Sequence, residues 1–262
     1  MLRWFEHHQV YCPSKLMEGS AADVGRPFEE VELVTTDQVR LHGWFFPADR
    51  QAPHAHVVFL LFHGNIGNIS HRLEFCRAWL ELGVNVFVFD YRGYGCSEGR
   101  PSEAGTYLDA QAAYAWLRQK GFAPTNIIAL GKSLGGGVAS ELALRETIGG
   151  LILQSTYTSI PDLGRELFPW LPGRSMGVIK YDTLSRLPRI KVPLLVMHSR
   201  NDALIRFSHA QNNFAAANEP KIFCEIAGGH TGVLEAGRTE YLRGLERYLA
   251  MHFKKAPSLA PA

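Results

Sequence analysis

The segment G-K-S-L-G at residues 131–135 constrains the fold of this chain more than any other part of the sequence. It follows an apolar run at residues 126–130, which predicts a buried strand, and it opens a helix-like stretch at residues 133–146. A serine between glycines at a strand-to-helix junction is the pattern of a nucleophile elbow. The alternative is a glycine-rich turn with a chance serine, but the flanking strand and helix favour the elbow. We therefore expect the hydroxyl of Ser133 to stand above a sheet, beside the free N–H groups of the new helix.

A serine nucleophile needs a base, and in folds built on such an elbow the acid and then the histidine follow the serine along the chain. His230 is the best candidate because it lies in a glycine-rich loop, residues 227–232, just after an apolar strand at residues 221–226. A histidine on such a loop can reach over the serine. The other histidines after Ser133 lie in amphipathic helical stretches or at a strand end, which favours structural roles; they are His198, His209 and His252.

The acid is predicted from its position at the end of a strand. Residues 193–198 form an apolar run typical of a buried parallel strand, and Asp202 lies in the loop that follows it. Ligand chemistry in open α/β sheets gathers at the carboxyl ends of the strands. The rival acids are Asp182, within an inserted segment, and Glu225, within a strand. Neither occupies a loop at a strand end, so we assign the acid to Asp202.

The oxyanion of an acyl-transfer reaction needs two backbone donors near the serine. One is the N–H of Leu134, the residue after the nucleophile. The second comes from the loop after the strand at residues 56–62, where Gly64 lets the chain turn the amide of Asn65 toward the site. We interpret the neighbouring His63 as a structural histidine.

These segments together resemble the α/β-hydrolase superfamily, and within it the Bem46-type branch, whose relatives include ABHD-type proteins. The resemblance rests on F-H-G-N at residues 62–65, F-D-Y-R-G-Y-G-C-S-E-G at 89–99, F-P-W-L-P at 168–172, I-K-V-P-L-L at 190–195 and A-G-G-H at 227–230. It implies a serine hydrolase acting on esters, thioesters or amides. It also implies a triad of Ser133, Asp202 and His230, the same residues that the motif order indicates.

Residues 157–191 form an insertion between two predicted strands. The insertion is rich in apolar residues, and prolines at several positions, including Pro161, break it into short pieces. We expect a small cap that lines an acyl pocket over the serine, with Phe168, Trp170 and Leu171 contacting the substrate. The alternative is a loop that only buries its apolar residues against the body of the protein.

The remaining pattern predicts one α/β domain over residues 1–262, with a mostly parallel central sheet flanked by helices. Alternating residues at 31–36 and 39–46 predict an antiparallel hairpin at one edge of that sheet. Residues 254–262 are rich in proline and alanine, which indicates a disordered tail. Further strands are expected at 84–89 and 150–153, and helices at 69–82, 102–120, 133–146, 207–217 and 237–253.

Composition restricts the partners. A formal net charge of +2 with no basic run argues against nucleic acid. The four cysteines have no metal-like spacing and are typical of a reducing compartment, so we expect no metal and no cofactor. The first ten residues hold no apolar run long enough for a signal peptide or a membrane span. Trp4 and Phe5 could contact a membrane surface, although packing on the protein is the commoner fate of such residues. We expect a cytoplasmic protein.

The function predicted from the sequence is two-step acyl transfer to water, from a small-molecule ester or thioester, through an acyl-enzyme. A serine peptidase or amidase on the same fold is the first alternative. A non-catalytic binding protein is the second, because a fold alone does not establish a function. Enzymes of this fold that use a carboxylate nucleophile are excluded, since Ser133 stands at that position.

Overall fold

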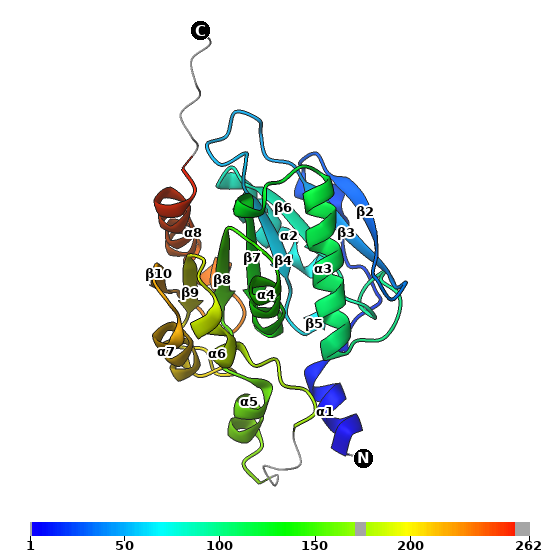
Figure 1. The fold of residues 1–262 in the computed structure, drawn as a ribbon, viewed down its shortest axis with the longest axis vertical. Coiled ribbons are helices and arrows are strands. Elements are labelled where there is room, and N and C mark those ends of the chain that lie inside the picture. The colour runs from blue at the N-terminus through cyan, green and yellow to red at the C-terminus, as the bar shows by residue number, and fades with distance from the viewer. Residues whose placement is uncertain (1, 171–176, 255–262) are drawn as a thin grey trace.

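An eight-stranded sheet lies at the centre of the computed structural model, which describes residues 2–170 and 177–254 (Figure 1). The strands lie in the order β10-β9-β8-β7-β4-β6-β3-β2. Neighbours from β10 to β6 run parallel, whereas β3 pairs antiparallel with both β6 and β2. The predicted parallel sheet with an antiparallel edge hairpin is therefore confirmed. The strands are β2 Glu29–Val34, β3 Arg40–Phe46, β4 Val58–Phe62, β6 Asn85–Phe89, β7 Ile127–Lys132, β8 Gly150–Gln154, β9 Leu194–His198 and β10 Lys221–Glu225.

The central strands are apolar on both faces because helices cover both faces of the sheet. Every residue of β4, β7, β8 and β9 is buried, as expected for parallel strands that pack on two layers of helices. The flanking helices are α2 Leu73–Glu81, α3 Glu103–Gln119, α4 Leu134–Arg145, α7 Phe207–Ala216 and α8 Val233–His252. Each predicted helix is present. The helix expected from residue 237 starts at Val233, and its backbone kinks at Gly237, where the predicted start lay.

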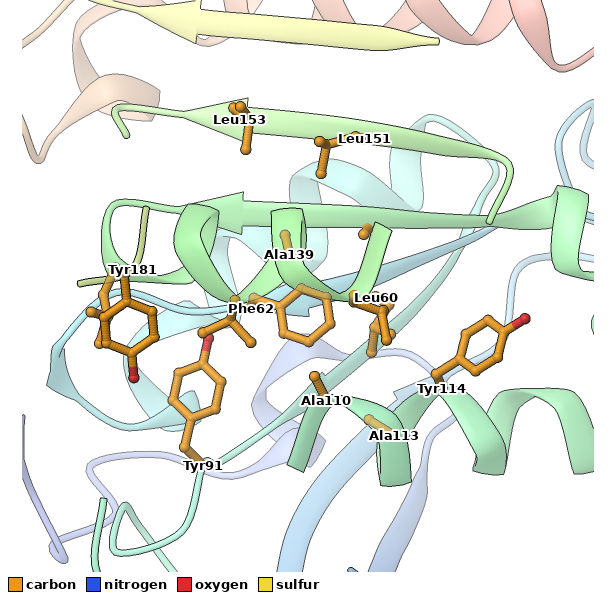
Figure 2. Close-up of a cluster of buried hydrophobic side chains, with 14 of the residues drawn as sticks. Leu60, Phe62, Tyr91, Ala110, Ala113, Tyr114, Ala139, Leu151, Leu153 and Tyr181 are labelled. Carbon is orange, nitrogen blue, oxygen red and sulfur yellow. The ribbon is translucent and has the colours of Figure 1, made fainter. Parts of the chain in front are cut away.

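Alternate residues of the central strands belong to two separate hydrophobic cores, one on each face of the sheet. In β4, Leu60 and Phe62 belong to the core between the sheet and helices α3 and α4, where Figure 2 shows Ala110 and Ala113 of α3 close to them. Phe59, between them in sequence, points to the opposite face and packs edge-on against Trp79 of α2, with ring centroids 6.2 Å apart. The two cores hold the carboxyl ends of the parallel strands in fixed positions at one end of the sheet.

The insertion between β8 and β9 forms two short helices, α5 Ile160–Leu167 and α6 Thr183–Arg186. An N-terminal helix, α1 Leu2–Val10, lies near α5 at the lower end of Figure 1. A second, two-stranded sheet pairs β1 Cys12–Pro13 with β5 Ile66–Gly67. Short 3₁₀ helices are η1 Ala21–Val24, η2 Ile69–Arg72, η3 Pro124–Asn126 and η4 Leu187–Arg189. In the described part of the chain, no helix has the length and apolar character to cross a membrane. Most of the expected tail, residues 255–262, lies outside the described residues.

Candidate active site

The elbow at the end of β7 holds its serine in a strained backbone conformation. Ser133 has φ 53° and ψ −116°, in the positive-φ region that side chains rarely adopt. The glycines on either side are required by close backbone contacts. A Cβ on Gly131 would lie 2.5 Å from the carbonyl oxygen of Gly135, and a Cβ on Gly135 would lie 1.8 Å from that of Phe62. The motif therefore reflects a turn in which only glycine fits, and this turn raises Ser133 above the sheet.

Three predicted residues from three strand ends meet in one hydrogen-bonded chain. Nε2 of His230 lies 3.1 Å from Oγ of Ser133, and Nδ1 of His230 lies 2.8 Å from Oδ2 of Asp202. Ser133 follows β7, Asp202 follows β9 and His230 follows β10. Because Asp202 accepts a hydrogen bond from the N–H at Nδ1, Nε2 carries no proton and is left as the acceptor for the serine hydroxyl. This arrangement can remove a proton from Ser133 as its oxygen attacks.

The carboxylate of Asp202 is held in its ionised form. Its Oδ1 accepts hydrogen bonds from the backbone N–H groups of Leu204, at 3.0 Å, and Ile205, at 2.8 Å. Burial alone would raise the pKa of Asp202, but the hydrogen bonds from His230 and Ile205 outweigh it and lower the pKa below its usual value. The acid therefore keeps its charge and could stabilise a positive charge on His230.

His198 supports the loop that carries this acid. Its side chain is fully buried, and Nε2 donates to the carbonyl oxygen of Ile205 at 2.8 Å. The same nitrogen lies 3.5 Å from Oδ2 of Asp202. Burial lowers the pKa of His198, so the ring is kept neutral and adds no second charge beside the triad. His198, at the end of β9, thus has the structural role that the sequence indicates.

The two predicted oxyanion donors lie on either side of the nucleophile. Leu134 is the first residue of α4, so its N–H has no partner within the helix. A Cβ on Gly64 would lie 3.6 Å from the Cβ of Ser133, which places the loop after β4 beside the serine. Nδ1 of His63 donates to the carbonyl oxygen of Gly64 at 2.7 Å. In a planar trans peptide the N–H points opposite to the carbonyl oxygen. By fixing the carbonyl oxygen of Gly64, this bond therefore also fixes the direction of the Asn65 N–H.

His63 is neutral and has one ring proton for that bond. Burial lowers its pKa to about 3, so the ring carries one proton, on the nitrogen that faces Gly64. Behind it, Oδ1 of Asp90 lies 3.5 Å from Nε2 of His63 and accepts from the N–H of Ile69 at 2.9 Å. Burial raises the pKa of Asp90 to about 7. A buried histidine and a buried carboxyl group therefore lie next to the loop of the second predicted oxyanion donor.

A cavity of about 100 Å³ opens beside Ser133. Its walls come from α5, from the acid loop and from α1, and none of the described residues that line it carries a charge. They are Gln9, Val10, Asn65, Ser133, Leu134, Tyr157, Ile160, Leu163, Gly164, Leu167, Phe168, Leu204 and Ile205. An apolar cavity lined by the predicted nucleophile and the two predicted oxyanion residues is suited to the acyl part of a substrate.

The three predicted substrate contacts have different locations. Phe168 lines the cavity. Trp170 does not appear among the described lining residues; its side chain is 73% exposed and packs edge-on against Phe168, with ring centroids 5.7 Å apart. Leu171 lies outside the described residues. Leu204 and Ile205, which the sequence interpretation missed, lie two and three residues after the acid and could have been inferred from that position.

Lys132 is a buried cation next to the nucleophile in sequence. Only 9% of the residue is exposed, and Nζ lies 4.6 Å from the centre of the Phe75 ring. Burial, together with the positive charge of Arg72, lowers the pKa of Lys132 to about 8, although Glu235 and Asp202 act in the opposite direction. Among the residues with described positions, no group of histidine, cysteine and acidic side chains is arranged to hold a metal ion.

Comparison with known proteins identifies the family and the fold. A family model described as the alpha/beta hydrolase fold matches residues 57–179. The chain is 34% identical over 277 residues to the alpha/beta hydrolase domain-containing protein WAV2 of Arabidopsis thaliana, covering 93% of this chain and 88% of WAV2. It is 38% identical over 168 residues to the protein bem46 of Schizosaccharomyces pombe, covering 60% of this chain and 56% of that protein. The solved structure of the Pyrococcus furiosus esterase Pf2001 superimposes with a TM-score of 0.76 at 21% identity, covering 93% and 97% of the two chains.

Proposed function

Because this chain belongs to the α/β-hydrolase family, among its Bem46-like members, we propose that it is a serine hydrolase that cleaves carboxylic esters of small, uncharged acyl groups. The observation that carries the proposal is the hydrogen-bonded chain from Ser133 through His230 to Asp202, at 3.1 Å and 2.8 Å, which opens into an uncharged cavity. A nucleophile, a base, an acid and two oxyanion donors are the complete requirement for acyl transfer.

The proposed reaction proceeds in two steps. Oγ of Ser133 attacks the acyl carbonyl carbon while Nε2 of His230 takes its proton, and the N–H groups of Asn65 and Leu134 stabilise the resulting oxyanion. His230 then gives the proton to the departing alcohol, which leaves an acyl-serine. A water molecule repeats the sequence on the acyl-serine, losing its proton to His230, and the carboxylic acid is released as Ser133 regains its hydrogen.

The cavity favours short acyl chains. A water molecule takes up roughly 30 Å³, and an apolar cavity of roughly 150 Å³ accommodates benzene. A cavity of about 100 Å³ therefore suits an acyl group of about two to four carbons. Because no described lining residue is charged, an anionic or cationic acyl group would be buried without a partner, at a considerable energetic cost. We expect acetyl to butyryl esters to be cleaved faster than longer or charged ones.

Labelling with a fluorophosphonate probe, with the adduct located by peptide mass, tests the proposal. We expect one adduct, on Ser133, and none in Ser133→Ala. An unlabelled native protein that is folded by circular dichroism would refute the proposed enzyme and favour the binding-protein alternative. Ester, thioester and anilide substrates with the same butyryl group would then separate esterase activity from thioesterase and amidase activity, because the acyl half of each substrate is identical.

The proposed partner is a small-molecule ester, and the proposed location is the cytoplasm. Of the two aromatic residues near the N-terminus, Trp4 is 65% exposed, whereas Phe5 packs edge-on against Phe168. A single exposed aromatic provides little area for membrane binding. We expect the protein to remain in the supernatant when sedimented with anionic lipid vesicles, and Trp4→Ala to behave in the same way.

A further inference from the structure

The N-terminal segment, residues 2–14, contacts the insertion that covers the active site. We call it the N-terminal arm. The ring of Phe5 packs edge-on against Phe168, which lines the acyl cavity, with centroids 5.6 Å apart. The carboxylate of Glu6, only 3% exposed, accepts from the N–H of Ile179 at 3.1 Å. The arm is therefore fixed to the insertion, and its residues Gln9 and Val10 line the cavity.

After α1, the arm pairs with the loop that carries the second oxyanion donor. The short parallel ladder aligns β1 with β5, which lies directly after Asn65. The N–H of Cys12 donates to the carbonyl oxygen of Asn65 at 3.1 Å, and the N–H of Ser14 donates to that of Gly67 at 3.1 Å. The side-chain amide of Asn68 donates back to the carbonyl oxygen of Ser14 at 3.1 Å. Three hydrogen bonds thus join this loop to a segment more than fifty residues earlier in the chain.

Asn65 is consequently fixed on both sides. On its amide side, His63 holds the peptide that carries the Asn65 N–H, through the carbonyl oxygen of Gly64. On its carbonyl side, Asn65 accepts from Cys12 and also from the buried hydroxyl of Tyr94, at 3.0 Å. A glycine stands on the amide side of this residue, and Gly67 adopts φ 82°, so the loop has little intrinsic rigidity. The hydrogen bonds from outside the loop must supply it.

We propose that the N-terminal arm and Tyr94 are positioning elements for catalysis, which hold Asn65 so that its N–H meets the oxyanion. The inference rests on the proposed function, since it assigns a role within that same acyl-transfer site. An oxyanion donor acts only if it is already aimed at the position where the charge develops. Removing one such donor costs about 10²–10³ in kcat, and a misplacement of about 1 Å costs up to about 10²-fold. Loosening the arm should therefore lower kcat about tenfold or more.

Cys12→Pro tests the arm directly, because proline lacks the N–H that Cys12 donates to Asn65. The oxyanion forms only in the transition state. The expected result is a fall of about tenfold in kcat with KM within about twofold of native, by the same factor for acetyl and butyryl esters. A change that merely altered the pocket would raise KM or change the acyl preference. A purely structural role would lower the amount of folded enzyme but leave kcat per active serine unchanged.

Tyr94→Phe provides a second test that leaves the backbone unaltered, with Tyr248→Phe as its matched control. Both hydroxyls are fully buried and donate to a backbone carbonyl: Tyr94 to Asn65 at 3.0 Å, and Tyr248 to Pro193, remote from the serine, at 2.8 Å. Both variants lose one similar hydrogen bond, so they should lose similar stability. Only Tyr94→Phe is expected to lose kcat, by about threefold to tenfold, because Cys12 still holds Asn65.

The outcomes separate this inference from the proposed function. Active sites are counted by fluorophosphonate labelling carried to completion, so that kcat is expressed per reactive Ser133. Complete labelling with reduced kcat in Cys12→Pro and Tyr94→Phe supports the inference. If both variants keep kcat within twofold of native and of Tyr248→Phe, the inference is wrong even though the enzyme is real. If Cys12→Pro does not fold, the tyrosine pair decides. Absence of labelling in the native protein would instead overturn the proposed function itself.

Discussion

Replacing Lys132 by methionine should stabilise this protein at neutral pH. Burial lowers the pKa of Lys132 from 10.5 to about 8, which means that the folded protein disfavours the charge. Since each tenfold change in proton affinity is worth about 1.4 kcal/mol, this difference corresponds to roughly 3 kcal/mol of lost stability at pH 7. The contact of the ammonium group with the Phe75 ring, at 4.6 Å, offsets about 0.5–2 kcal/mol of this loss. Methionine keeps the apolar stem without the charge, so we expect Lys132→Met to gain roughly 1–3 kcal/mol.

The pH dependence distinguishes this cause from simple repacking. Because the pKa is lower in the folded state, the unfolded chain binds more protons between pH 8 and 10.5, and the contribution of Lys132 to native stability rises with pH across that window. The advantage of Lys132→Met should thus be largest below pH 8 and shrink as pH approaches 10.5. Urea unfolding of both proteins at pH 7, 8, 9 and 10.5 measures it. The difference between them cancels the titration of the buried tyrosines, which both proteins share.

Lys191→Met is the matched control, since Lys191 is an exposed lysine and its replacement should change stability by less than about 0.5 kcal/mol. The reasoning is refuted if Lys132→Met is less stable than native at pH 7, or if its gain is the same at pH 7 and pH 10.5.

Three further predictions concern the site and its surroundings. Asp202→Asn should lower kcat by about 10³–10⁴-fold in ester hydrolysis, because the amide would donate to Nδ1 of His230 and impose the wrong tautomer. Phe168→Ala should shift the preferred acyl chain to longer esters, whereas Trp170→Ala, 73% exposed in native protein, should leave the chain-length profile unchanged; the reverse result would contradict the assignment of the cavity. Asp90, whose pKa burial raises to about 7, contributes stability that is present below pH 4 and lost as pH rises through 7. The free energy of unfolding of Asp90→Asn, relative to that of native, should therefore increase by roughly 2 kcal/mol from pH 5 to pH 8 in urea unfolding. A difference that does not change with pH would exclude this titration as the cause.

The sheet and the elbow could be predicted because their sequence signals arise from burial and from steric restriction. β4 is apolar at every position, and β9 is buried throughout and apolar up to its last residue, His198, because both faces of the sheet are covered. The glycines flanking Ser133 are fixed by contacts that no side chain would tolerate. The predicted acid and base lie near the elbow because β7, β8, β9 and β10 run parallel, so that their carboxyl ends meet at one end of the sheet.

The walls of the cavity could not be predicted to the same extent. The insertion is divided into short pieces, but the pattern of prolines does not show that Pro161 lies in the first turn of a helix, α5, where proline is well tolerated, with Ser159 as the N-cap. Neighbouring apolar residues such as Phe168 and Trp170 do not reveal which of them faces the serine. The pairing of β1 with β5 involves two residues on each side, too few for any periodicity, and it joins segments far apart in the chain. Contacts of this kind become visible only in three dimensions.

Buried ionisable groups near Ser133 lower the stability of the folded protein. His63 and Asp90 lie next to the loop of Asn65, and Lys132 precedes Ser133 in sequence. Burial shifts the pKa of each group in the direction that favours its neutral form. At neutral pH these shifts cost stability at Asp90 and Lys132, which would be charged in the unfolded chain, as expected for buried ionisable groups with incomplete pairing. Shifted pKa values of this size gather preferentially at functional sites. If Lys132→Met is both more stable and less active than native, the buried ammonium group is retained for catalysis; if it is more stable and equally active, the charge has no role in the reaction.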